Sequence, residues 1–284
     1  MGNGRHIGLA TWSGLPELDP DDRLLLPLLQ GAACHVRPVV WSDPAVDWTQ
    51  FDLVVVRSTW DYYRRYAEFL AWLARAGRQT DLWNPPATLR WNTHKGYLRD
   101  LARSGTRVIP TVWGSDGRSL ATVVAEVGWK ELVLKPAVSA AGTGAVRFDA
   151  SEAPAHQALF ERMLSDGEVL VQPYVGSVET LGERSLVFLD GEFSHAVLRA
   201  PKLSAGSPLR EGAPVVPSAA ELEVARKVLA TYPEKTLYAR VDLAPDASGH
   251  PWLMELELTE PLLYLASSPG AADRFAAAIR RRLE

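Results

Sequence analysis

The sequence predicts an α/β protein of three lobes, in which an N-terminal lobe with a parallel sheet precedes two α+β lobes. Its 284 residues are enough for two or three hydrophobic cores. Strands and helices alternate over residues 1–90, which is typical of a parallel sheet. The paired prolines of Asn84-Pro85-Pro86 then interrupt both helix and sheet. We therefore place the lobes at residues 1–90, 91–175 and 176–284.

In the first lobe, apolar runs predict buried strands, and apolar residues at helical spacing predict helices. The predicted strands are His6 to Trp12, Val36 to Trp41 and Phe51 to Arg57. The predicted helices are Leu24 to Leu29, which follows the acidic turn Asp21-Asp22, and Tyr66 to Ala76.

The second and third lobes show more strands than helices. The predicted strands are Val108 to Trp113, Glu131 to Lys135, Ala145 to Phe148, Val169 to Gln172, Ser185 to Asp190, Phe193 to Arg199, Tyr238 to Leu243 and Trp252 to Leu258. The predicted helices are Thr93 to Arg103, Leu222 to Leu229 and Ala272 to Leu283. The stretch from Pro201 to Pro217 is rich in Pro, Gly and Ser, and a loop of that length in a compact domain is usually functional or disordered.

Composition and charge exclude several classes of protein. A net charge of −4 and a pI of about 5.9 argue against a general affinity for nucleic acid. No apolar run is long enough to span a membrane. Cys34 is the only cysteine, so no internal disulfide can form and we expect a cytoplasmic protein. The oligomeric state stays open, with a homodimer as one option.

A pair of glutamates at Glu255 and Glu257 is the most informative motif. On a strand, alternate side chains share a face, so these two carboxylates point the same way. A hairpin would bring Asp242 beside them. Three carboxylate ligands without His or Cys favour Mg²⁺ as the bound ion. The alternative is an edge hairpin with solvated carboxylates.

Lys135 stands at a strand end and is followed by a loop of small residues, Ser139 to Gly144. A lysine supplies a point charge and such a loop offers backbone N–H groups, so the pair suits phosphate. The segment lacks the Gly-Lys-Ser/Thr ending of a Walker A loop. A surface lysine beside an ordinary turn is the alternative.

The strand Val169 to Gln172 runs into Pro173, which interrupts its hydrogen bonding. Free backbone groups at such a hinge, with apolar side chains nearby, are suited to reading adenine. An ordinary strand end is the alternative, and the neighbouring motifs decide between the two.

Taken in order, these motifs resemble the ATP-grasp superfamily, and the layout is similar to bacterial glutathione synthetase almost from end to end. The matching residues are Arg57, Asn84-Pro85, Asn92 to Lys95, Lys135, Gln172 to Val175, Arg184, Arg199, Asp242, Glu255 and Glu257. The resemblance implies an ATP-grasp fold whose second and third lobes bind ATP. One departure is Glu257, where glutathione synthetase has asparagine.

The resemblance also implies a role for each position. Lys95 and Lys135 would contact ATP phosphates beneath the loop with Ser139, Gly142 and Gly144, while Gln172, Tyr174 and Val175 would flank adenine and Glu179 the ribose. Arg184 and Arg199 would stabilise the transferred phosphate. Asp242, Glu255 and Glu257 would hold two Mg²⁺ ions.

The turn Arg57-Ser58-Thr59-Trp60-Asp61-Tyr62 and the segment Lys135 to Ser139 resemble another branch, that of O-ureido-serine cyclo-ligase. This resemblance implies a small amino-acid-like substrate, bound by Arg57, Ser58, Trp60, Asp61 and Tyr62. Arg57 or Lys202 would neutralise its carboxylate and Asp61 its ammonium. Arg57 as a structural pin and Trp60 as core filling are the alternatives.

The implied reaction is attack of a carboxylate on ATP to give an acyl phosphate, which a nitrogen nucleophile then captures. In the cyclo-ligase interpretation that nitrogen belongs to the same molecule. An intermolecular amino-acid or peptide ligase is the main alternative, and a nucleotide-binding regulator without turnover is another. The loops at Ser139 to Gly144 and Pro201 to Pro217 would act as lids.

Overall fold

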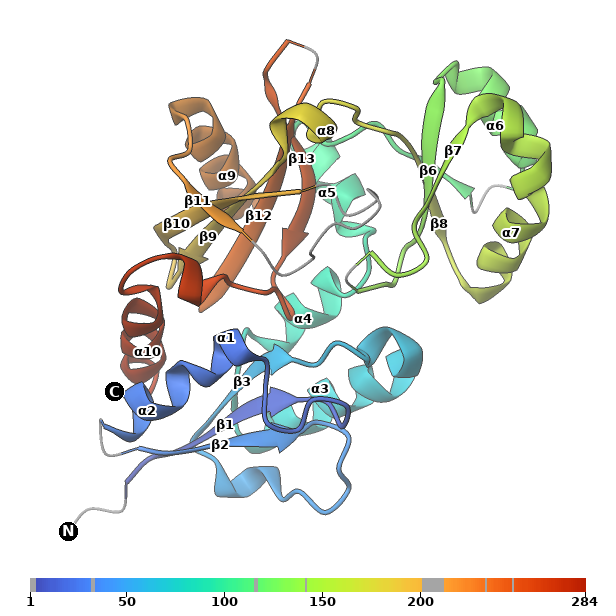
Figure 1. Cartoon of the computed structure of the whole chain (residues 1–284). Coiled ribbons are helices and arrows are strands. Elements are labelled where there is room, and N and C mark those ends of the chain that lie inside the picture. Colours follow the sequence, from blue (N-terminus) through green and yellow to red (C-terminus); the bar gives the residue numbers. More distant parts are fainter. Residues whose placement is uncertain are drawn as a thin grey trace.

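The computed structural model describes residues 4–31, 34–114, 117–140, 142–200, 212–232, 234–246 and 248–284. Within them, three separate sheets each build one lobe (Figure 1). The N-terminal lobe lies below the other two in this view, and the second lobe projects to the right. The predicted combination of one parallel and two further lobes is confirmed.

The first lobe is a parallel sheet in the order β2-β1-β3-β4. Its strands are β1 (His6–Thr11), β2 (His35–Val40), β3 (Leu53–Ser58) and β4 (Asp81–Trp83). Helices α1 (Pro20–Arg23), α2 (Leu25–Gln30) and α3 (Tyr66–Gln79) connect them. All six residues of β3 are buried, as a continuous apolar run in a parallel sheet requires.

The second lobe is a small antiparallel sheet in the order β5-β8-β6-β7. Its strands are β5 (Val112–Trp113), β6 (Glu131–Pro136), β7 (Val146–Asp149) and β8 (Val169–Pro173). Helices α6 (Leu120–Val127) and α7 (Ala153–Asp166) close its core through Leu120, Val123 and Phe160.

The third lobe is an antiparallel sheet in the order β11-β10-β9-β12-β13. Its strands are β9 (Glu183–Leu189), β10 (Glu192–Arg199), β11 (Ala213–Val215), β12 (Tyr238–Pro245) and β13 (Pro251–Glu257). Its helices are α8 (Val178–Leu181), α9 (Ala219–Thr231) and α10 (Ala271–Arg281). β9 and β10 are joined by a tight hairpin turn, with Asp190 and Gly191 both at positive φ (54° and 83°).

Two helices connect the first lobe to the rest, and here the sequence prediction was partly wrong. The helix expected from Thr93 to Arg103 is instead α4 (Pro86–Asn92) followed by α5 (Tyr97–Arg103). The break exists because the Lys95 N–H donates to the carbonyl of Ala137 (2.8 Å) and not to a helical partner. α5 then packs into the core of the third lobe, although it precedes the second lobe in sequence.

The strand expected from Val108 to Trp113 is mostly irregular. Only β5 is regular, apart from an isolated bridge between Val108 and Leu253. Pro110 explains the difference, because proline has no N–H to donate to a ladder.

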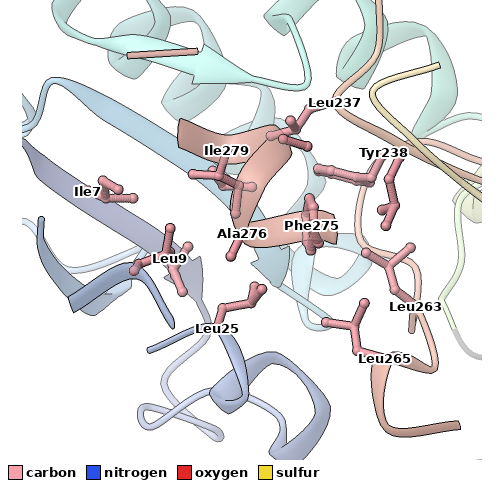
Figure 2. Close-up of a cluster of buried hydrophobic side chains, with 14 of the residues drawn as sticks. Ile7, Leu9, Leu25, Leu237, Tyr238, Leu263, Leu265, Phe275, Ala276 and Ile279 are labelled. Carbon is pink, nitrogen blue, oxygen red and sulfur yellow. The ribbon is translucent and has the colours of Figure 1, made fainter. Parts of the chain in front are cut away.

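The core of the first lobe is shared with the end of the chain. α10 packs against α2, and Phe275, Ala276 and Ile279 meet Leu9 and Leu25 in one buried cluster (Figure 2). Tyr238 of β12 joins the same cluster. None of the described helices is both long enough and apolar enough to span a membrane.

Candidate active site

Three carboxylates converge at the β12–β13 hairpin, as the sequence predicts. Asp242 pairs with Glu255 and Arg240 with Glu257 in the ladder, which places all four side chains on one face of the sheet. One oxygen each from Asp242, Glu255 and Glu257 lie within 4.8 Å of one another. Clustered hard oxygen donors of this kind fit Mg²⁺.

Two arginines surround this carboxylate cluster. Arg199 of β10 forms ion pairs with Asp242 (2.8 Å) and Glu183 (3.0 Å) and is buried. Arg240 donates from Nε and Nη2 to the two oxygens of Asp242 (2.9 Å each) and also contacts Glu257. Arg240 was not predicted to belong to the site, although it lies two residues before Asp242 on a strand and therefore shares its face.

The larger of two adjoining cavities lies between the second and third lobes, and its empty volume, counted out into open solvent, is about 750 Å³. Strands β6, β8, β12 and β13 supply seven of its sixteen lining residues, and loops supply most of the rest. Its lining residues are Lys95, Ile109, Val133, Lys135, Ser139, Gly142, Ala145, Gln172, Pro173, Tyr174, Val175, Val178, Glu183, Asp242, Met254 and Glu255. Apolar walls with convergent charges at one end are typical of a ligand site.

The charged end of this cavity is formed by two lysines and a glutamate. The Nζ atoms of Lys95 and Lys135 lie 4.0 and 3.9 Å from Oε1 of Glu255. Lys95 also donates to Ser139 Oγ (3.0 Å), at the start of the small-residue loop. Gly142 lines the cavity, whereas Gly144 does not. Gly144 instead packs against Pro136, since a Cβ at position 144 would lie 2.9 Å from Pro136 Cγ.

The predicted hinge after β8 forms the opposite end. Gln172 is buried and donates to Thr111 Oγ1 (2.8 Å), while Tyr174 and Val175 line the cavity beside Pro173. Glu179 does not line it. Its carboxylate instead accepts from the Tyr174 hydroxyl (3.1 Å) and pairs with Arg147.

A second, smaller cavity, whose empty volume counted out into open solvent is about 420 Å³, adjoins the first at the lysine end. It shares Lys95, Ser139, Gly142 and Glu255 with the larger cavity. Its remaining lining residues are Tyr62, Asn92, Tyr97, Ala140, Leu256, Glu257 and Glu260. The two cavities therefore meet at Lys95 and Glu255.

The N-lobe turn reaches this second cavity through one residue. Tyr62 lines it, and its hydroxyl donates to the Ser139 carbonyl (3.2 Å). Trp60 does not line it, but its Nε1 donates to the backbone carbonyl of Glu260 (3.0 Å). The Asp61 carboxylate is buried and accepts from Trp41 Nε1 (2.7 Å), so it is not placed to receive a ligand.

Arg57 and Ser58, predicted to contact substrate, lie instead in the lobe interface. Both side chains donate to the carboxylate of Asp22 (2.8 Å each). Arg57 also donates to the Pro261 carbonyl (2.7 Å) and stacks over the Tyr238 ring (4.7 Å). The geometry therefore favours the alternative that Arg57 is a structural pin between lobes.

Arg184, predicted to stabilise the transferred phosphate, lies apart from the carboxylate cluster in the structure. It pairs with Glu221 of α9 (3.0 Å) and lines neither cavity. The reason is strand alternation: Glu183 and Ser185 face the carboxylate cluster, so Arg184 points to the other face of β9. Lys202 and most of the predicted Pro201 to Pro217 lid lie outside the described residues.

Glu260 was not predicted to belong to the site. It follows β13 and lines the second cavity, where burial and the nearby charge of Glu257 raise its pKa to about 8. The signal in the sequence was its position three residues after Glu257, the last carboxylate of the predicted cluster.

Comparison with known proteins agrees with this geometry. Residues 7–84 match the N-terminal domain of D-cycloserine synthetase DcsG, and residues 104–239 match the ATP-grasp domain of prokaryotic glutathione synthetase. A cycloserine biosynthesis protein, DcsG of Streptomyces lavendulae, is 34% identical over 93% of this chain and 95% of its own.

Solved structures show the same relationship. The crystal structure of D-cycloserine synthetase DcsG has a TM-score of 0.90 and 32% identity, covering 98% of this chain and 100% of that one. A RimK domain ATP-grasp protein from Sphaerobacter thermophilus shares only the fold (TM-score 0.72, 18% identity, 97% and 99% covered).

A paired-cavity site with two lysines and three carboxylates, on this three-lobed fold, defines an ATP-grasp ligase, an enzyme class that uses ATP and Mg²⁺. Within that class, the chain belongs to the family of D-cycloserine synthetase DcsG. The resemblance predicted from the sequence is confirmed.

Proposed function

We propose that this enzyme closes a ring within one small amino-acid molecule, converting O-ureido-serine to cycloserine at the expense of ATP. The observation that carries the proposal is the pair of adjoining cavities. The larger is suited to a nucleotide, and the smaller has room for one short polar molecule beside the phosphate-binding end. The membership in the DcsG family supports the same substrate.

In the larger cavity, Lys95 and Lys135 would bind the ATP phosphates beneath Ser139 and Gly142. The hinge at Gln172, Tyr174 and Val175 would hold adenine between its backbone groups and the apolar Met254 and Val133 walls. Lysine ammonium groups act here as point charges that offset repulsion between the triphosphate and a substrate carboxylate.

At the junction, Asp242, Glu255 and Glu257 would hold two Mg²⁺ ions. Bound Mg²⁺ supplies positive charge that neutralises the phosphate oxygens during transfer. Arg199 and Arg240 hold the carboxylates in position through their ion pairs, and their guanidinium groups add charge beside the same point. Arg240 also compensates the extra negative charge of Glu257.

In the smaller cavity, the substrate carboxylate would lie against Lys95 and attack the γ-phosphorus of ATP. The products of this step are ADP and an acyl phosphate. The ureido nitrogen that is bonded to oxygen, held in the same cavity, then attacks the acyl carbon and loses its proton as phosphate leaves. The ring formed still carries the carbamoyl group, which water removes as carbon dioxide and ammonia to leave cycloserine. A tethered nucleophile can reach effective molarities on the order of 10⁵ M or more, so a second substrate site is not needed.

The test is the nucleophile requirement. O-ureido-serine alone, with ATP and Mg²⁺, should support ADP release without any added amine, and hydroxylamine should trap a hydroxamate of the substrate. The measurement is coupled ADP release with mass analysis of the product. A strict requirement for a second, amine-bearing substrate, with a linear amide as product, would establish the intermolecular alternative.

Nucleotide binding gives a separate test of the lysine assignment. Lys135→Ala should weaken ADP binding roughly 10- to 100-fold, because a hydrogen bond to a charged group is worth about 1.5–3 kcal/mol. Calorimetric titration with ADP and Mg²⁺ measures this directly. Lys130→Ala is the matched control, since Lys130 is exposed and lies just before the other end of β6. Unchanged ADP affinity in Lys135→Ala would remove that residue from the phosphate site.

A further inference from the structure

Glu260 carries a carboxylate in the second cavity to which the mechanism above gives no role. The residue is partly buried, and among the described residues its carboxylate has no hydrogen bond or ion pair. The two other acids of this cavity are engaged: Glu255 lies near Lys95 and Lys135, and Glu257 contacts Arg240.

The neighbouring polar groups of the cavity also have partners in the protein. The Asn92 amide donates to the Leu256 carbonyl and accepts from the Leu258 N–H (2.7 Å each). The Tyr97 oxygen accepts from the Leu256 N–H (3.1 Å), and the Tyr62 hydroxyl donates to the Ser139 carbonyl. Glu260 is therefore the acid of this lining that is available to a ligand.

The backbone around Glu260 is fixed from the N-terminal lobe. Trp60 donates to the Glu260 carbonyl and Arg57 to that of Pro261 (3.0 and 2.7 Å). These two bonds come from the N-lobe turn and hold the segment that follows β13 in place. A carboxylate on a fixed backbone, facing a small cavity, is pre-organised for binding.

We propose that Glu260 binds the α-ammonium group of the amino-acid substrate in the second cavity. This rests on the proposed function, in which the carboxylate of the same molecule lies at the Lys95 end. An α-amino acid carries its two charges on adjacent carbons, so a cavity with cations at one side and a carboxylate in its wall matches the zwitterion. Asp61, the earlier candidate for the ammonium, is excluded by its hydrogen bond with Trp41 and its place outside both cavities.

Electrostatics supports this pairing. Withdrawing a carboxylate from water is costly unless a cation accompanies it. Burial and Glu257 raise the pKa of Glu260 to about 8, and a bound ammonium favours the ionised form. Held as an ammonium, the α-amine also has no lone pair, so it cannot compete with the ureido nitrogen for the acyl phosphate.

The test is a double-mutant-type cycle, in which the amine is removed from the substrate and the charge is removed from residue 260, separately and together. O-ureido-serine is compared with its des-amino analogue, 3-(ureidooxy)propanoate, in the unaltered enzyme and in Glu260→Gln. The unaltered enzyme should lose roughly 10- to 100-fold in kcat/KM with the analogue, as expected for a charged hydrogen bond. In Glu260→Gln, kcat/KM should differ only a few-fold between the two substrates. The reason is that this variant no longer binds the amine, so its KM for O-ureido-serine is already raised.

Two variants make the outcome specific. Glu260→Asp keeps the charge on a shorter side chain and should fall between the other two enzymes, whereas the exposed Glu223→Gln should behave as the unaltered enzyme. Equal losses with the des-amino analogue in the unaltered enzyme and in Glu260→Gln would overturn the proposal, because residue 260 would then not sense the amine.

This outcome is distinct from failure of the proposed function. If the unaltered enzyme releases no ADP with O-ureido-serine, the ring-closure proposal fails. The same cycle is then run with whichever amino acid an ADP-release screen identifies, together with its des-amino counterpart. If that screen finds only substrates without an α-amine, the Glu260 proposal is overturned as well.

Discussion

Replacing Glu255 with glutamine is expected to lower kcat roughly 10²- to 10³-fold at saturating ATP and Mg²⁺. Losses of this size accompany removal of one electrostatic group at the point where transition-state charge develops. Glu255 lies at that point, because it lines both cavities and its oxygen is within 4.0 Å of two lysines. Glutamine keeps the shape but removes the charge that holds Mg²⁺.

The measurement is steady-state turnover together with ADP affinity at several Mg²⁺ concentrations. The variant should fold normally and should lose most of the Mg²⁺ dependence of ADP binding. Glu192→Gln, on the exposed start of β10, is the matched control and should leave both quantities unchanged. Turnover within a few-fold of the parent at saturating Mg²⁺ would refute the assignment of Glu255 as a metal ligand.

Asp22→Asn is expected to reduce the free energy of unfolding by about 3–5 kcal/mol, since it leaves the buried charge of Arg57 without its partner. The two side chains are 1% and 3% exposed and lie 2.8 Å apart. Arg57 also has a buried Nη1 without a hydrogen-bond partner among the described residues, so its position already depends on Asp22. Urea denaturation and the melting temperature measure the loss.

The control for this variant is an exposed ion pair in the same lobe. Arg65 and Glu68 are 41% and 50% exposed, and Glu68→Gln should cost at most about 1 kcal/mol. If Arg57 is a structural pin, Asp22→Asn should leave KM for the substrate within a few-fold in the remaining folded enzyme. A large rise in KM with little loss of stability would contradict the structural role and indicate that Arg57 binds the substrate.

Features governed by local pattern were predictable from the sequence. The alternation of Glu255 and Glu257 places both carboxylates on one face, and the short connection after Asp242 forces a hairpin, so the carboxylate cluster follows. The placement of Lys135 and of the small-residue loop after it was predictable in the same way, from the end of a single strand. The parallel first sheet follows from its alternating elements and from the fully buried run of β3.

Features set by contacts between distant segments were not predictable. Arg57 donates hydrogen bonds to Asp22 and to the carbonyl of Pro261, and neither partner is near it in sequence. Resemblance alone placed Arg184 at the site, whereas the structure puts it on the opposite face of β9 from Glu183, where it pairs with Glu221. Glu260 belongs to the site only because the N-terminal turn and α4 close the cavity around it.

The shared core of α10 and the first lobe has a consequence for how the chain folds during synthesis. Apolar side chains of β1 and α2, such as Leu9 and Leu25, find partners in Phe275, Ala276 and Ile279, which leave the ribosome far later (Figure 2). N-terminal units usually fold first as they emerge. The first lobe therefore exposes an apolar face until α10 has been synthesised. We expect the nascent chain to bind chaperones that shield such surfaces.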